Sequence, residues 1–172
     1  HSAAVARGTH RAMVIADLGQ IFGGLKDEVI VRLNKELPAV FHHGNVLLSP
    51  THTHAGPGGY AHHLLYNITT MGFSPENFET IVAGITQSIV NAYRQQENAD
   101  LSLSRGQVEG AQWNRSPDAY ILNPETERRL YPENIDREMT LLKAMSKEGK
   151  ALASFNWFPV HGVSMPMDNQ IV

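Results

Sequence analysis

The sequence predicts a mixed α/β fold, and three consecutive stretches near its start indicate this. Residues 10–17, HRAMVIAD, are apolar and β-branched enough to form a strand. Residues 25–37 repeat a leucine or valine every four positions, which is the spacing of one helical face, and Pro38 would end that helix. Residues 45–49, NVLLS, are typical of a short buried strand. This order predicts a right-handed βαβ crossover with parallel strands, as part of a mixed sheet with flanking helices.

A hairpin and a second helix extend this prediction. Residues 2–7 are expected to pair with the first strand through a turn at residues 8–9. Ser74 is suited to be an N-cap and Pro75 to be the first residue of a helix. Apolar residues then recur along one face as far as Tyr93, so this helix should pack against the core.

The last third of the chain predicts further strands. Residues 101–110, LSLSRGQVEG, alternate enough for a strand. Residues 114–137 are rich in Pro, Asn, Arg and Glu, and we expect a long irregular excursion there, which in a compact domain is more often functional than not. Residues 139–145 and 151–158 flank a turn at SKEGK and predict an antiparallel C-terminal hairpin.

Composition excludes several function classes. The chain has 172 residues, which is enough for one domain with a real core. Its 14 basic and 17 acidic residues give a formal charge of -3, which argues against a nucleic-acid partner. It has no cysteine, so disulfide frameworks and thiol catalysis are excluded. No apolar run approaches the ~18 residues of a membrane-spanning helix, and no signal segment is recognisable. Both ends have the character of cuts inside a larger fold.

Two histidines follow the second predicted strand, in NVLLSPTHTHAGPGGY. If the strand continues through Thr51, His52 and His54 share one face, because side chains two apart in a strand point the same way. Ligands of open α/β sheets bind beyond the carboxyl ends of the strands. The glycines that follow would let the backbone pass close to a ligand or metal. Such pairs also occur on ordinary surface strands, so the alternative is a pair without a metal role.

His161 ends another predicted strand, in SFNWFPVHGVSM, and is also followed by glycine. A hydrolytic zinc site takes about three protein ligands and leaves one position for water. His52 and His161 could be two of these ligands, with His54 either a third ligand or a neighbour that handles protons. The alternative for His161 is a strand-end histidine that is satisfied by hydrogen bonds.

Three further positions have candidate roles. Arg115, between Asn114 and Ser116, could reach a substrate oxygen with its fork of donors, or it could be a surface arginine in a loop. Asp17 ends the first strand and could orient a metal-bound histidine or cap a turn. Residues 67–69 form a glycosylation sequon, a triplet that is common by chance.

These motifs, in this order, resemble the neutral ceramidases. The resemblance covers residues 10–165 and rests on THTHAGPGG, NRSP and WFPVHG, together with ADLGQ and GFSPENFETIVAGITQSIVNA. It implies a zinc amidohydrolase that cleaves the N-acyl bond of ceramide to give sphingosine and a fatty acid. It further implies that His52 and His161 bind zinc, that His54 contacts the substrate or transition state, and that Arg115 lies near the substrate.

The resemblance also implies that residues 1–172 are the N-terminal portion of a longer catalytic domain. In the family a glutamate, a tyrosine and a serine of the active site lie further downstream. Pro50 and the string PMDN depart from the usual family pattern, which affects the expected shape of the pocket. An extracellular, periplasmic or membrane-associated location and contact with a membrane surface are implied as well. The resemblance does not imply an oligomeric state.

Two alternatives accompany this interpretation. The first is a metallohydrolase on the same scaffold that acts on another N-acyl or ester substrate. The second is a non-catalytic fragment or binding module whose histidines are structural. Zinc analysis separates the second alternative from the enzymes, and assays with different acyl substrates separate the enzymes from each other.

Overall fold

The structure is a computed structural model that describes residues 2–6, 10–131, 133–162, 165 and 168. The chain forms two compact units. The first unit contains His1–Gln96 and Gly162–Val172, and the second contains Glu97–His161. Each unit has helices and strands, so the predicted mixed α/β class is confirmed.

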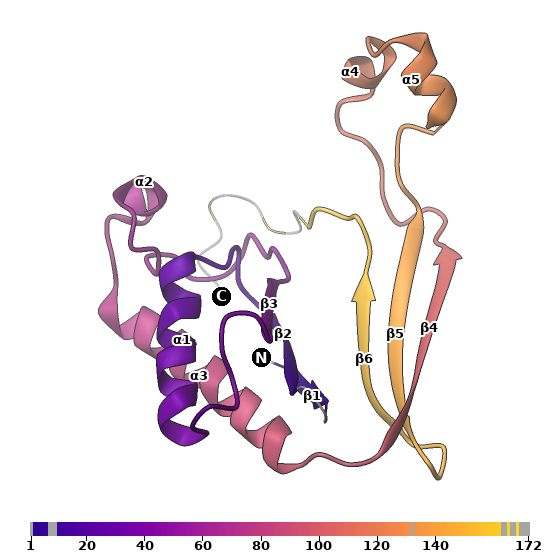
Figure 1. Cartoon of the computed structure of the whole chain (residues 1–172). Helices are drawn as coiled ribbons and strands as arrows, with labels where there is room; N and C mark the ends of the chain where they lie inside the picture. Colours follow the sequence, from indigo (N-terminus) through magenta and orange to yellow (C-terminus); the bar gives the residue numbers. More distant parts are fainter. Residues whose placement is uncertain (1, 7–9, 132, 163–164, 166–167, 169–172) are drawn as a thin grey trace. The chain divides into compact units, whose positions relative to one another are not determined.

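The first unit contains a three-stranded sheet in the order β1-β2-β3 (Figure 1). Strand β1 (Ser2–Ala6) is antiparallel to β2 (Arg11–Ala16), and β3 (Val46–Pro50) is parallel to β2. The predicted hairpin pairing and the βαβ crossover are therefore confirmed, while the predicted turn at residues 8–9 lies outside the described residues. Because Ala16 pairs with Pro50, β2 and β3 end side by side at one edge of the sheet.

Two long helices pack with this sheet in one core (Figure 1). Helix α1 (Gly23–Glu36) connects β2 to β3, and helix α3 (Pro75–Arg94) begins where it was predicted. The side chain of Ser74 accepts a hydrogen bond from the backbone N–H of Asn77, as an N-cap does. Both helices bury the apolar stripe that the sequence spacing indicated.

The core of the first unit consists of aliphatic side chains from the central strand and both helices. Complete burial of one such side chain stabilises a fold by about 1.5–3 kcal/mol. The core members from these elements are fully or almost fully buried and include Ala12, Val14, Ala16, Leu25, Val29, Leu33, Val82, Ile85 and Ile89.

A charged contact also joins the two helices. The guanidinium of Arg32 on α1 donates two hydrogen bonds to the carboxylate of Glu79 on α3, over 2.5 and 2.6 Å. These hydrogen bonds lower the pKa of Glu79 below its ordinary value. Both side chains retain access to solvent, so the pair is a surface contact.

Two short helical pieces between β3 and α3 were absent from the sequence prediction. Helix α2 (Leu64–Asn67) is followed at once by the 3-10 turn η1 (Ile68–Thr70). Neither is long enough to show an apolar period. The buried side chain of Asn67 holds them by donating a hydrogen bond to the backbone carbonyl of Ala61.

The second unit is an antiparallel sheet in the order β4-β5-β6 (Figure 1). It contains β4 (Ala99–Gln107), β5 (Glu138–Ser146) and β6 (Ala151–Trp157), and the pairing of β5 with β6 confirms the predicted C-terminal hairpin.

The connection between β4 and β5 is more regular than the sequence predicted. Helices α4 (Pro117–Ile121) and α5 (Glu125–Leu130) lie within residues 114–137, so the expectation of a wholly irregular excursion was wrong. Helix α4 starts at Pro117, which suits a first turn, and Pro124 is the residue immediately before α5. Among the described helices, none combines the length and the apolar character that crossing a bilayer requires.

Candidate metal site

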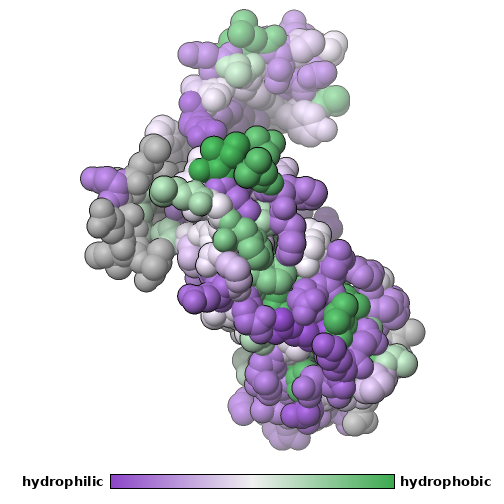
Figure 2. All heavy atoms as spheres, turned by 90° about the vertical axis from the view of Figure 1, so that its left-hand side faces the viewer, coloured by the Kyte–Doolittle hydropathy of each residue, from purple (hydrophilic) through white to green (hydrophobic). Residues whose placement is uncertain are grey.

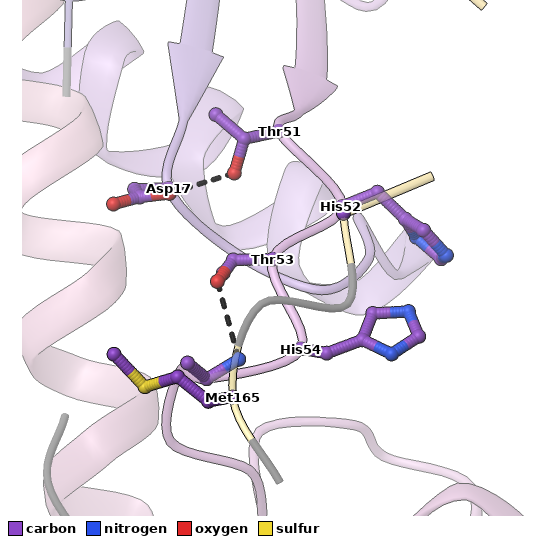
Figure 3. A pocket seen from close by; sticks show the side chains of 8 residues that line it. Asp17, Thr51, His52, Thr53, His54 and Met165 are labelled. Atoms are coloured by element: carbon purple, nitrogen blue, oxygen red, sulfur yellow. Dashed lines mark hydrogen bonds between the residues drawn. The ribbon is translucent and has the colours of Figure 1, made fainter. Parts of the chain in front are cut away.

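The site begins where the parallel strands β2 and β3 end. The backbone N–H of Thr51 donates to the carbonyl of Ala16 over 2.9 Å. The hydroxyl of Thr51 donates to a carboxylate oxygen of Asp17 over 2.7 Å (Figure 3). The two loops that leave the sheet are thus joined where they begin. This contact brings Leu18–Gln20 and Thr51–His54 to the same edge of the sheet.

His52 has a left-handed backbone, with φ of 60°. The predicted continuation of the strand through Thr51 to the histidines was therefore wrong, since β3 ends at Pro50 and this backbone angle is incompatible with a strand. The rings of His52 and His54 are nevertheless neighbours, with centroids 5.0 Å apart and planes at 75°. Figure 3 shows both rings directed to the same side of the loop, away from Asp17.

One backbone carbonyl orients the ring of His52. The Nδ1 atom of His52 lies 2.7 Å from the carbonyl oxygen of Gly19. A carbonyl can only accept, so Nδ1 must carry the proton, and the lone pair of the neutral ring is then on Nε2. This is the arrangement by which a second hydrogen bond fixes the tautomer of a metal-binding histidine.

Three imidazoles meet at this edge. Ring nitrogens of His52, His54 and His161 all lie within 4.8 Å of one another. His161 is joined directly to Gly162, and Gly162 and Met165 line the same cavity of about 210 Å³ as the first two histidines. Imidazole nitrogens are preferred ligands of zinc, so the donor set fits a zinc ion with further ligands or water in the remaining positions.

The glycines after His54 serve the packing of the protein itself. A Cβ atom on Gly58 would lie 2.1 Å from Cγ2 of Thr70. Gly59 has φ of 76°, and its carbonyl accepts from the backbone N–H of Ser74 over 2.7 Å. The amide of Asn77 donates to the carbonyl of Gly58 over 2.6 Å. These contacts hold the turn against η1 and the start of α3. Gly56, Gly58 and Gly59 also line a cavity, so the turn adjoins space for a ligand, as the sequence suggested.

A second cavity of about 280 Å³ adjoins the first. Thr53 and His54 contribute to both cavities, and the second continues to Phe22, Tyr60 and Tyr66. Its lining is therefore partly aromatic, next to an imidazole, which suits a ligand with both an apolar and a polar part.

The remaining candidates have different surroundings. Asp17 accepts the hydrogen bond from Thr51. The contact that orients the ring of His52, at Nδ1, comes from the carbonyl of Gly19 instead, a role that the sequence did not predict. Arg115 is an exposed residue of the second unit, at a bend before α4, and its substrate role stays a prediction. Asn67 is only 4% exposed, so its sequon is a poor acceptor for a glycan in this fold.

The comparisons with known proteins agree on one family. The sequence matches the family described as "Neutral/alkaline non-lysosomal ceramidase, N-terminal" over residues 3–172. The neutral ceramidase of Drosophila pseudoobscura pseudoobscura is 40% identical over 166 residues, covering 96% of this chain and 24% of that protein. The neutral ceramidase of Pseudomonas aeruginosa is 35% identical over 167 residues, covering 97% and 25%.

Solved structures agree with the sequence matches. The crystal structure of neutral ceramidase from Pseudomonas aeruginosa is similar with a TM-score of 0.90 and 35% identity, over 96% of this chain and 26% of that one. A structure described as "Ceramidase complexed with C2" matches with a TM-score of 0.89 and 35% identity, over 97% of this chain and 26% of that one. The chain thus spans about a quarter of the length of these relatives. It belongs to the neutral/alkaline non-lysosomal ceramidase family and matches the N-terminal part of it.

Proposed function

We propose that the protein containing this chain is a zinc-dependent amide hydrolase that cleaves the N-acyl bond of ceramide, giving sphingosine and a fatty acid. The observation that carries this proposal is the cluster of His52, His54 and His161 in a chain of the ceramidase family. Imidazole nitrogens within 4.8 Å of one another suit a hydrolytic metal site in which two of the rings bind the ion and the third lies beside it.

In this proposal His52 and His161 hold the zinc ion, as the resemblance of their motifs implies. When bound, zinc supplies a Lewis acid that activates water and polarises the amide carbonyl. The carbonyl of Gly19 keeps the ring of His52 in one orientation, so its Nε2 nitrogen is presented for coordination without a search among rotamers.

His54 is the proposed catalytic group of this chain. Its ring lies beside that of His52, and it lines both cavities. A protonated or Nε2–H imidazole at that position can donate a hydrogen bond to the oxygen that gains negative charge as the amide carbon becomes tetrahedral. The departing amine of sphingosine must also receive a proton, which requires a general acid. Arg115 is the second proposed substrate contact, through a hydrogen bond to a polar oxygen.

Metal analysis of the complete gene product tests the zinc assignment. We expect about one zinc per chain, and we expect His52→Ala and His161→Ala to empty the site because each removes one ligand. His43→Ala is the control, since His43 is an exposed histidine beside Asp27 on the first unit. Normal zinc content in both ligand variants would remove the metal assignment.

A comparison of substrates tests the ceramide assignment. We expect the complete gene product to hydrolyse a fluorescent ceramide with a higher kcat/KM than simple N-acyl amides or esters of equal acyl length. A preference for a simple amide or ester would favour the alternative metallohydrolase. Loss of turnover in His54→Ala with retained zinc would support the catalytic role of that residue, whereas full turnover would exclude it.

We further propose that residues 64–73 contact a lipid surface. This segment has no acidic or basic residue, and it exposes large apolar side chains at Leu64, Leu65, Ile68 and Met71, the last with 98% of its surface accessible. Figure 2 shows hydrophobic atoms gathered on the face of the first unit that carries α2. Tyr66 of the same segment lines the second cavity, so this apolar surface adjoins the cavity that suits a ligand with both an apolar and a polar part.

Vesicle binding tests this contact. The double variant Leu64→Asn with Leu65→Asn should bind phosphatidylcholine–ceramide vesicles several-fold more weakly, while turnover of a detergent-dispersed short-chain substrate is retained. The matched control is Leu101→Asn with Leu103→Asn, two leucines on β4 with 66% and 63% exposure. Equal vesicle binding by the two double variants would refute the proposal.

We also propose an extracellular, periplasmic or membrane-associated location, which the resemblance to the ceramidase family implies. Fractionation of cells that express the complete gene product would test it. Recovery of all the protein in the cytosolic fraction would contradict this location.

A further inference from the structure

A buried tyrosine reaches the loop that follows β2. Tyr60 is only 4% exposed, and its hydroxyl makes two hydrogen bonds to the backbone of one residue, Gln20. It accepts from the N–H of Gln20 over 3.2 Å and donates to the carbonyl of Gln20 over 3.1 Å. A phenol can do both at once, so the polar end of this side chain is satisfied by the loop.

The first of these hydrogen bonds falls on the peptide unit that also contacts His52. The carbonyl of Gly19 and the N–H of Gln20 belong to the same planar group of atoms. Nδ1–H of His52 donates to that carbonyl over 2.7 Å, and the hydroxyl of Tyr60 accepts from that N–H. The peptide plane is therefore held at both ends, by His52 at one and Tyr60 at the other.

The surroundings leave this peptide little freedom. A Cβ atom on Gly19 would lie 3.3 Å from the carbonyl oxygen of Thr53 and 3.9 Å from the hydroxyl of Tyr60. The ring of Tyr60 packs against that of Phe22, with centroids 5.3 Å apart. The hydroxyl is thus carried by a ring that is itself part of the core.

We propose that Tyr60 is a positioning residue for the metal site. It fixes the Gly19–Gln20 peptide plane, and that plane fixes the tautomer and ring angle of His52, a proposed zinc ligand. The inference rests on the proposed function for its metal. Because Tyr60 also lines the second cavity, its positioning role is tested by zinc affinity and not by turnover. Without the phenol oxygen, the peptide can rotate and the imidazole loses its fixed acceptor.

The experiment compares zinc affinity in Tyr60→Phe with that of the unaltered complete gene product, by competition with a chromophoric chelator. Loss of an outer partner of a metal-binding histidine weakens metal affinity by about 10–100-fold. Tyr60 acts one step further from the metal, so we expect Tyr60→Phe to weaken zinc affinity by about tenfold. The visible absorption of the Co²⁺-substituted protein should also shift, because the angle of one imidazole changes. Tyr93→Phe is the control, since Tyr93 also packs in the core, beside His10 and Phe41.

A second variant covers the case in which Tyr60→Phe fails to fold. Gly19→Ala leaves Tyr60 in place and displaces the same peptide, because the new Cβ would lie 3.3 Å from the carbonyl oxygen of Thr53. It should also weaken zinc binding and shift the Co²⁺ spectrum. Unchanged affinity and spectrum in folded Tyr60→Phe or Gly19→Ala would overturn the inference while the proposed function stands. Absence of metal binding by the unaltered protein would overturn both.

Discussion

Replacing His52 by glycine and by alanine separates its two roles, as a proposed ligand and as a residue with a strained backbone. Both variants lose the imidazole and its hydrogen bond to Gly19, so neither should hold zinc at this site. Their folded states differ in how well the new residue accepts φ of 60°. The prediction is that, in the absence of metal, His52→Gly is the more stable of the two.

The magnitude follows from two opposing effects. Alanine in the left-handed region costs about 1–2 kcal/mol, whereas glycine adopts it without steric cost. Glycine also gains about 0.4–1 kcal/mol more conformational entropy in the unfolded chain, which acts in the other direction. The free energy of unfolding should therefore be higher for His52→Gly by about 0.5–1 kcal/mol.

Urea unfolding in EDTA, followed by circular dichroism at the helical minimum, measures this difference. The helical signal reports on the first unit, which contains the long helices α1 and α3. Without chelator and with excess zinc, only the unaltered protein should become more stable, because only it binds the ion in its folded state. A His52→Ala variant as stable as His52→Gly would refute the left-handed assignment and the loop geometry built on it.

Three further predictions concern the framework of the site. Ser74→Ala should lower the free energy of unfolding by about 1 kcal/mol, because the backbone N–H of Asn77 loses its capping acceptor, and urea titration measures this. Ile85→Ala should cost about 2–5 kcal/mol, since Ile85 is fully buried and a cavity remains, and a conservative Ile85→Val should cost about 0.5–1.5 kcal/mol in the same titration. Glu79→Gln should be less stable than the unaltered chain above pH 4.5. This difference in stability should fade as the pH falls further, because Arg32 lowers the pKa of the Glu79 carboxyl in the folded state and only stronger acid protonates it there. Thermal unfolding of both proteins at pH 7 and pH 3 measures the difference. A stability difference that does not change with pH would contradict the prediction.

The parts of the fold that the sequence predicted are those whose signal is local. The four-residue spacing from Leu25 to Leu37 and the Ser74-Pro75 start both act within one helix, and both were found. Helix α2 depends on a hydrogen bond from Asn67 to Ala61, and a contact of that kind leaves no periodicity to recognise. Tertiary contacts decide such short pieces.

In the candidate site, too, some features were predicted from the sequence and others were not. The proximity of His52 and His54 was predicted, but from a strand that the structure ends at Pro50. A left-handed turn brings the rings together instead, and the conformation of a single residue is not encoded in an alternating pattern. The orienting role of Gly19 could not be predicted, because every residue has a backbone carbonyl and only the folded chain selects one.

The attachment of the glycine turn to α3 has a consequence for how the protein moves. Gly58 and Gly59 accept hydrogen bonds from Asn77 and Ser74, at the first turn of a helix whose far end is in the core. The backbone amide proton of Ser74, which is donated to the carbonyl of Gly59, should therefore exchange with solvent at a rate set by fraying of that helical end. Any substitution that loosens the start of α3 would then widen the range of positions sampled by the imidazole of His54, without a change in a single atom of the metal-binding cluster.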